Sequence, residues 1–167
     1  MHILRVVVLN LALSALVIAL ATLALWADRW WPFALPGWLV PLAWPLLILG
    51  ALLILAAEYT LLTQGGATGA PGDHTRRLVT GGPYRFMRNP IYAGEAALLL
   101  AVAFFARSPS FLALAIAFSI TIHLFVRLVE EPHARRRFGQ AYFDYQRRVP
   151  RWAPRLPEPA RPGGDHI

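Results

Sequence analysis

The stretch LVTGGPYRFMRNPIYAG (residues 78–94) decides how the chain is organised, because turn-forming, basic and aromatic residues interrupt long apolar segments there. The residues from Thr80 to Pro83 predict a turn. Asn89 followed by Pro90 predicts a helix start, with the Asn side chain capping free amides and Pro in the first helical position. The stretch is therefore expected to join a turn to the mouth of a helix.

Two arginines and a tyrosine, Tyr84, Arg85 and Arg88, lie between this turn and this helix start. A guanidinium binds carboxylate and phosphate groups well, and a helix N-terminus favours anions. The stretch thus predicts a site for an anionic or nucleotide-like ligand at a membrane surface.

The composition indicates an integral membrane protein. Of 167 residues, 57% are hydrophobic and only 15% are charged. The chain has no Cys, which excludes disulfides and thiolate chemistry, and its formal charge is +7. Because the arginines lie beside apolar segments and form no nucleic-acid motif, membrane lipids with anionic headgroups are the expected partner, and nucleic acid is not.

Four apolar segments predict an all-α bundle of about four transmembrane helices. For the first, a cleaved signal peptide is the alternative interpretation. The third has 17 residues, short for a span. The expected spans are Ile3–Ala27, Trp38–Thr63, Pro90–Ala106 and Phe111–Val129.

The segment Pro132–Val149 has apolar residues at spacings of three and four with arginines between them, which predicts an amphipathic cytoplasmic helix. One membrane domain is expected. Residues 1–63 form two spans, residues 64–90 a cytoplasmic loop with the site, and residues 91–167 two spans, the amphipathic helix and a Pro-rich tail.

The distribution of arginine orients this bundle. With both termini in the cytoplasm, fourteen of the sixteen basic residues lie inside, and Arg29 and Arg107 lie outside. The site is then cytoplasmic, and a bacterial inner membrane is the expected location.

Few polar side chains fall within the spans. Arg127 and Glu131 are four residues apart, which predicts either a plain ion pair or a pair that orients and deprotonates a substrate. Glu58 is either an interfacial carboxylate or a site wall, and His123 is expected to be a packing residue. No second His or carboxylate stands at ligand spacing, so no metal site is predicted.

Tyr84, Phe86 and Tyr92 are either interfacial aromatic residues or walls of an adenine-sized pocket. Gly81 and Gly82 stand without a glycine-rich fingerprint or a preceding strand, which excludes a Rossmann-type nucleotide site.

Two blocks of the sequence resemble the integral-membrane methyltransferases that include isoprenylcysteine carboxyl methyltransferase and, more distantly, phospholipid N-methyltransferases. The first, LVTGGPYRFMRNPIYAG, is similar to the family's G-x-Y-x-x-x-R-[HN]-P-x-Y-x-G block. The second, EEPHARRRFGQAYFDYQRRVPRWAP, is similar to its C-terminal block that begins with two glutamates. They occur in the family's order, with two spans between them.

The resemblance implies an S-adenosylmethionine-dependent methyltransferase acting on a lipophilic substrate, either a prenylated carboxylate or a lipid headgroup. It implies that Arg127 and Glu131 are catalytic. It also implies that six residues line the cofactor site: Tyr84, Arg88, Asn89, Pro90, Tyr92 and Glu130.

One residue departs from the pattern, because Asn89 stands where the prenylcysteine enzymes carry His. An amide keeps hydrogen bonding but cannot carry the charge of an imidazolium, which leaves the methyl acceptor open. Two alternatives stay open as well. An NADPH-dependent enzyme similar to sterol reductases is one, since Arg88–Glu95 partly matches their R-x-P-x-Y-x-G-E run. A non-enzymatic membrane scaffold is the other.

Overall fold

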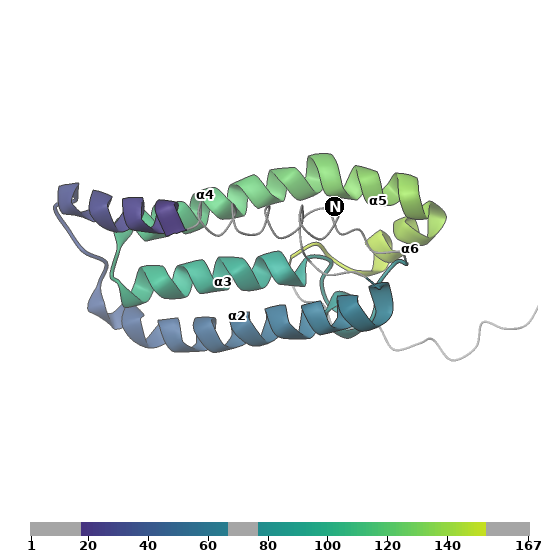
Figure 1. Cartoon of the computed structure of the whole chain (residues 1–167), viewed down its shortest axis with the longest axis horizontal. Helices are drawn as coiled ribbons and strands as arrows, with labels where there is room; N and C mark the ends of the chain where they lie inside the picture. Colours follow the sequence, from purple (N-terminus) through teal and green to yellow (C-terminus); the bar gives the residue numbers. More distant parts are fainter. Residues whose placement is uncertain (1–17, 67–76, 153–167) are drawn as a thin grey trace, which may run out of the picture.

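The computed structural model describes residues 18–66 and 77–152, and all regular structure within these ranges is helical (Figure 1). Residues 18–27 are helical. The following elements, of which η3 and η5 are π-helical turns, are Asp28–Trp30 (η1), Gly37–Leu39 (η2), Val40–Thr60 (α2), Leu61–Gly65 (η3), Gly82–Arg85 (η4), Pro90–Phe105 (α3), Pro109–Phe125 (α4), Val126–Glu130 (η5), Glu131–Phe138 (α5) and Gln140–Arg148 (α6).

Two of the helices in the described ranges are long and apolar enough to cross a membrane. They run without a break over Gly37–Gly65, 29 residues, and Pro109–Phe138, 30 residues. The helix α3 is apolar but has only 16 residues. The helices predicted over Trp38–Thr63 and from Pro90 are thus confirmed as helices, whereas most of the segment Ile3–Ala27 lies outside the described residues.

The helices α2 and α3 lie side by side in opposite directions and pack through two glycines (Figure 1). A Cβ atom on Gly50 would lie 2.9 Å from the carbonyl oxygen of Gly94, and one on Gly94 would lie 2.6 Å from Cγ1 of Ile54. Glycine therefore permits a helix approach that any side chain would prevent.

The turn between α3 and α4 is held by Arg107 and Ser108. Arg107 has a left-handed backbone with φ of 52°, and the Ser108 N–H bonds to Ala103 O at 2.9 Å, as at many helix ends. Ser108 Oγ accepts from Phe111 N at 2.9 Å and caps α4, just before the first residue of the expected span Phe111–Val129.

The segment after residue 27 is bonded to this turn. Leu35 N donates to Arg107 O at 2.9 Å, and Ser110 N donates to Oδ1 of Asp28 at 3.0 Å. Burial alone would raise the pKa of Asp28, but hydrogen bonds from Ser108 and Ser110 hold that pKa below its usual value.

At the other end of the molecule the chain reverses at Gly139 (Figure 1). This glycine has φ of 55° and ψ of −133°, a backbone region that side chains rarely adopt. The prediction of one amphipathic helix over Pro132–Val149 is therefore wrong in its continuity, because Gly139 divides the segment into α5 and α6. Tyr142, Tyr145 and Val149 then pack into one buried cluster, which also contacts Leu78, Ala134 and Phe138.

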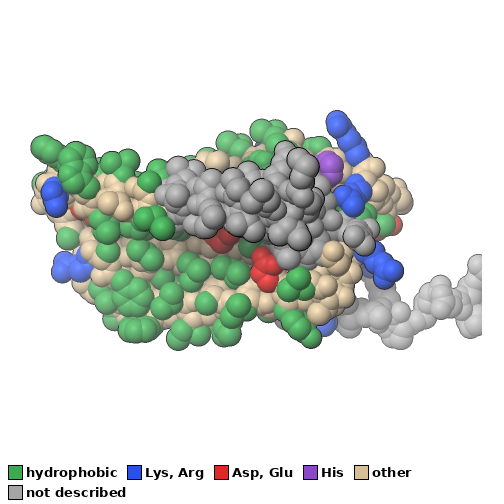
Figure 2. Space-filling view, viewed as in Figure 1, with side chains coloured by type: hydrophobic (Ala, Val, Ile, Leu, Met, Phe, Trp, Pro, Cys, Tyr) green, Lys and Arg blue, Asp and Glu red, His purple; other side chains and the backbone are tan. Residues whose placement is uncertain are grey.

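Hydrophobic side chains cover much of the surface between the two ends, while basic side chains gather at the ends (Figure 2). On α2, for example, Leu49, Leu52 and Leu55 are each more than half exposed, with relative areas of 65%, 57% and 65%. This is the surface that a helical protein presents to lipid.

Candidate functional site

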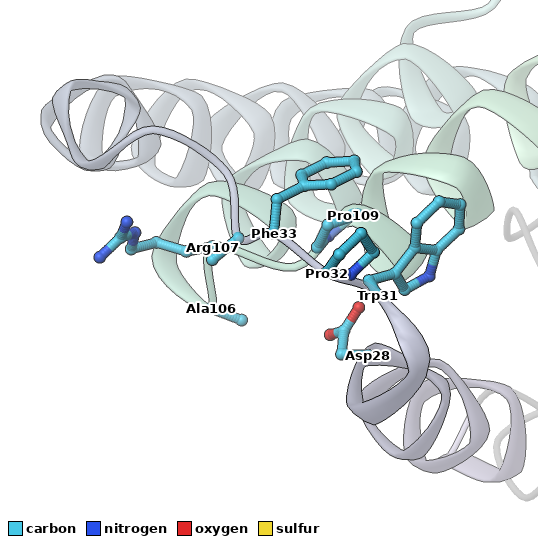
Figure 3. A pocket seen from close by; sticks show the side chains of 8 residues that line it. Asp28, Trp31, Pro32, Phe33, Ala106, Arg107 and Pro109 are labelled. Carbon is cyan, nitrogen blue, oxygen red and sulfur yellow. The ribbon is translucent and has the colours of Figure 1, made fainter.

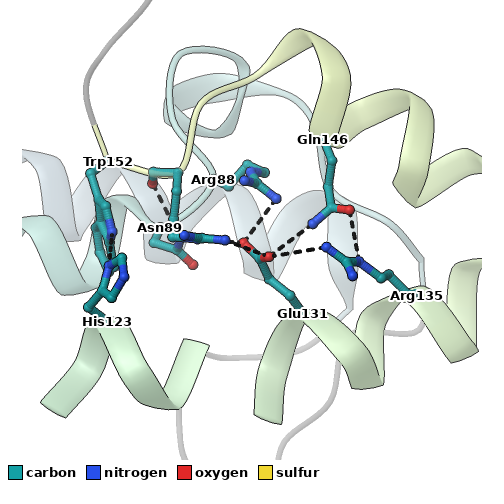
Figure 4. Close-up of polar contacts among 8 residues, drawn as sticks. Arg88, Asn89, His123, Glu131, Arg135, Gln146 and Trp152 are labelled. Carbon is teal, nitrogen blue, oxygen red and sulfur yellow. Dashed lines mark hydrogen bonds and ion pairs between the residues drawn. The ribbon is translucent and has the colours of Figure 1, made fainter. Parts of the chain in front are cut away.

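Two segments far apart in the sequence are joined beside the N-terminus of α3 (Figure 4). The backbone N–H of Arg88 donates to the carbonyl of Pro150 at 2.9 Å, and the Asn89 side-chain amide donates to the carbonyl of Arg151 at 3.3 Å. Deeper in the contact, the Tyr145 hydroxyl donates to the carbonyl of Tyr84 at 2.6 Å. The stretch of residues 78–94 is thereby fixed against the end of the C-terminal block.

The carboxylate of Glu131 is the centre of this junction (Figure 4). It is buried, with 2% of its residue area exposed. Arg151 donates to both oxygens, from Nε to Oε1 at 2.7 Å and from the terminal nitrogen Nη2 to Oε2 at 2.8 Å, and these bonds raise the pKa of the Arg151 guanidinium. Gln146 Nε2 donates to Oε2 at 3.0 Å. Both oxygens of Glu131 are thus fully engaged.

Two further arginines lie against the same carboxylate. Nη1 of Arg88 is 3.0 Å from Oε1, and Nη2 of Arg135 is 3.6 Å from Oε2. Three guanidinium groups that would otherwise repel one another share one buried negative charge, so Glu131 organises the junction electrostatically.

Arg88 keeps unused hydrogen-bonding capacity. Its side chain is 10% exposed, and within the described residues its buried Nε and Nη1 atoms make no hydrogen bond, although Nη1 lies 3.0 Å from Oε1 of Glu131. A buried donor without an acceptor is costly and rare in proteins. The arrangement is suited to an anionic ligand that would accept from Arg88.

A second polar group lies on the adjoining face of α3. The hydroxyl of Tyr92 donates to Oε1 of Glu130 at 2.7 Å. Burial raises the pKa of Tyr84, and the negative charges of Glu58 and Glu130 raise it further. Both carboxylates therefore act electrostatically on that phenol. Acidic and phenolic groups therefore gather beside the basic junction.

His123, on α4, faces the last described residue. The Trp152 indole N–H donates to Nδ1 of His123 at 3.0 Å, and the two rings lie 6.1 Å apart between their centroids (Figure 4). This bond assigns the proton of a neutral imidazole to Nε2. His123 was expected to be a packing residue, and the structure adds Trp152 as its hydrogen-bond partner.

The structure separates the predicted pair of Arg127 and Glu131. Arg127 is exposed, whereas Glu131 is paired with Arg88, Arg135 and Arg151. The plain ion pair, one of the two alternatives that the spacing predicted, therefore does not form, and the turn between the two residues, Val126–Glu130, is π-helical.

The predicted cofactor-site residues are brought together at the start of α3, with one local correction. Pro90 is buried at the first helical position, as expected. Asn89 occupies the cap position, but its side chain makes no capping hydrogen bond. Its amide nitrogen donates to the Arg151 carbonyl.

Several residues that make these contacts were not assigned to a site from the sequence, among them Tyr145, Gln146, Arg151 and Trp152. They lie in the second block, which shows a run of arginines and aromatic residues ending at Pro150. That proline ends the helix, and the change from helix to extended chain was the available signal for a contact with another segment.

Two further observations concern possible sites elsewhere in the described residues. No group of three or more His, Cys, Asp or Glu residues that could hold a metal occurs in residues 18–66 and 77–152. A shallow cavity of about 380 Å³ lies at the opposite end of the bundle, where Asp28, Trp31, Phe33 and Arg107 contribute to its lining (Figure 3). It does not include any residue of the arginine junction.

Comparison with known proteins identifies the family. The family model described as phospholipid methyltransferase matches residues 38–141, from the turn before α2 into α6. Searches of curated proteins and of solved structures gave no match. The match includes the whole stretch of residues 78–94 and spans more than half of the 167-residue chain. The chain therefore belongs to the phospholipid methyltransferase family, which makes it a membrane methyltransferase.

Proposed function

We propose that the protein transfers a methyl group from S-adenosylmethionine to the headgroup amine of a membrane lipid at the cytoplasmic face. The observation that carries this proposal is the junction at Glu131, which leaves Arg88 with two buried nitrogen atoms that lack an acceptor. The family match supplies the reaction class, and the site supplies the residues.

The membrane arrangement that we propose has four spans with both termini inside. The helical residues 18–27, α2, α3 and α4 provide the segments, and α3, at about 1.5 Å per residue, covers most of a ~30 Å hydrocarbon layer. Fourteen of the sixteen arginines then lie on the cytoplasmic side, together with the junction.

The residues at the junction fit the amino-acid part of S-adenosylmethionine, which carries a carboxylate and an ammonium group. Arg88 has unused donors for the carboxylate, and Glu130 offers a carboxylate of its own beside Tyr92. Asn89 and Pro90 hold the backbone of this corner. When bound, the cofactor supplies an electrophilic methyl group.

An amine suits this site better than a carboxylate as methyl acceptor. Arg127, which was expected to orient a carboxylate, is exposed, and Arg151 is fully engaged by Glu131. Glu58 and Glu130 instead place negative charge around Tyr84. Carboxylates hold an ammonium headgroup and accept its proton as the nitrogen becomes nucleophilic.

Calorimetric titration of the detergent-solubilised protein with S-adenosylhomocysteine tests this function. We expect saturable binding by wild type, about tenfold or more weaker binding by Arg88→Gln, and unchanged binding by Arg136→Gln, whose arginine is exposed on α5. Circular dichroism verifies that each variant is folded. Absence of saturable binding by folded wild type would overturn the proposal, and binding of NADPH in its place would favour the reductase alternative.

A further inference from the structure

The residues Val149–Trp152, which we call the C-terminal strap, follow α6 and lie outside the family match, which ends at residue 141. Val149 has an extended backbone with φ of −115° and ψ of 123°, so the strap begins where helical hydrogen bonding ends. A short extended segment keeps its place only through bonds to other parts of the molecule.

The strap is bonded to three separate elements (Figure 4). The carbonyls of Pro150 and Arg151 accept from Arg88 and Asn89, just before α3. The indole of Trp152 donates to His123 on α4, and the Arg151 guanidinium donates to Glu131 at the start of α5. Its position is thus determined by partners that are far away in the sequence.

Arg151 and Arg88 share one oxygen atom. Nε of Arg151 is 2.7 Å and Nη1 of Arg88 is 3.0 Å from Oε1 of Glu131. Arg151 alone makes two parallel hydrogen bonds to the carboxylate, and such a fork fixes its orientation. The orientation of Glu131 in turn decides which nitrogen atoms of Arg88 are left for a ligand.

The backbone provides a second link between the same residues. Because the Arg88 N–H is bonded to the Pro150 carbonyl, displacing the strap would move the main chain of Arg88 as well as its ion-pair partner. The strap is therefore linked to Arg88 in two ways, through the Arg151 bonds to Glu131 and through the Pro150 carbonyl.

We propose that Arg151 is a positioning residue of the methyl-transfer site, which it serves by holding the C-terminal strap and Glu131 so that Arg88 presents its free donors to the cofactor. This inference rests on the proposed function, because Arg88 is assigned to the cofactor there. It extends the site beyond the part of the chain that the family model matches.

The test measures S-adenosylhomocysteine affinity by calorimetry for Arg151→Gln, Arg151→Lys and the control Arg148→Gln. Arg148 is exposed, and its hydrogen bond to another described residue, from Nε to the Asp144 carbonyl at 3.3 Å, stays within α6. We expect Arg151→Gln to weaken binding by about tenfold or more, Arg151→Lys to recover part of the loss, and the control to bind as wild type does.

A double variant separates positioning from a general structural role. If Arg151 acts through Arg88, the variant with both Arg88→Gln and Arg151→Gln should bind no more weakly than Arg88→Gln alone. Additive losses would overturn the proposal. If Arg151→Gln does not fold, Arg151→Lys decides, because it keeps the charge but not the fork, and wild-type affinity in that variant would equally overturn the proposal.

Failure of this inference can be told apart from failure of the proposed function. Wild type that binds no S-adenosylhomocysteine contradicts the function and the inference together. Wild type that binds, with Arg151→Gln equal to it, contradicts the role of the strap alone.

Discussion

At the scale of single residues, Glu131 and Arg127 differ far more than their spacing in the sequence indicates. Glu131 is 2% exposed and contacts three guanidinium groups and an amide, whereas Arg127 is exposed. The pattern in the sequence treats them as one pair. The structure makes Glu131 part of the framework and leaves Arg127 at the surface.

Glu131→Gln is therefore expected to destabilise the fold by about 3 kcal/mol, because it leaves buried guanidinium groups without their counter-charge. Arg127→Gln should change stability by less than about 0.5 kcal/mol. Unfolding of both variants in detergent, followed by circular dichroism, measures the difference. If the Glu131→Gln variant were as stable as wild type but had no turnover, the structural role would be contradicted and a catalytic role of Glu131 would be supported.

The residues that could be predicted are those whose role follows from a local motif. Ser108 caps α4 and Pro90 begins α3, and both roles depend on neighbours in the sequence. Asn89 and Arg151 could not be predicted in the same way, since their side chains or carbonyls are bonded across 62 positions of the chain. Local propensity contains no information about such partners.

At the scale of elements, the apolar segments that the structure describes are helical as predicted, and the errors occurred where one helix changes into another. The segment Phe111–Val129 was expected to end as a span, but a π turn at Val126–Glu130 joins it to α5 in one helix of 30 residues. Gly139 then ends α5 inside a segment whose hydrophobic spacing is continuous. Periodicity records which face is apolar, and it does not record a local change in the number of residues per turn.

The contact between α2 and α3 yields a prediction for Gly94→Ala. The added Cβ would meet Ile54 at 2.6 Å and the Gly50 carbonyl at 2.8 Å, and the backbone atom cannot move aside without displacing a helix. We expect a loss of about 1–3 kcal/mol in stability. Thermal unfolding in detergent measures this loss.

Gly37→Ala is the matched control, because its Cβ would meet only Arg107 Cζ, at 4.0 Å. We expect that variant to unfold at the wild-type temperature. Equal unfolding temperatures for Gly94→Ala and Gly37→Ala would contradict the close approach of α2 and α3.

At the scale of the whole molecule, the two ends of the bundle differ in structure and in proposed function. At the end with Asp28 and Arg107, hydrogen-bonded turns and caps connect the helices. The end with Glu131 contains the arginine cluster and the candidate site (Figures 1 and 2). The proposed topology places these ends on opposite sides of the membrane.

Labelling with a membrane-impermeant maleimide tests that topology, because the chain has no cysteine of its own. Ala34→Cys and Ala141→Cys introduce single thiols at exposed positions at the two ends. We expect the Ala34→Cys protein to react in intact cells and the Ala141→Cys protein to react only after permeabilisation. The reverse pattern would place the site outside the cytoplasm.

Methyl transfer into lipid is the reaction that we propose, and it can be measured directly. Membranes that contain the wild-type protein are incubated with methyl-labelled S-adenosylmethionine. Alkaline hydrolysis of the lipid extract then separates alkali-labile label, released from methyl esters as volatile methanol, from alkali-stable label, which stays on nitrogen in a non-volatile product. We predict alkali-stable label in the headgroup amine, retained with Arg136→Gln and reduced about tenfold or more with Arg88→Gln. Folded protein that binds S-adenosylhomocysteine but leaves the lipid fraction unlabelled would contradict the account, and alkali-labile label would show that the acceptor is a carboxylate.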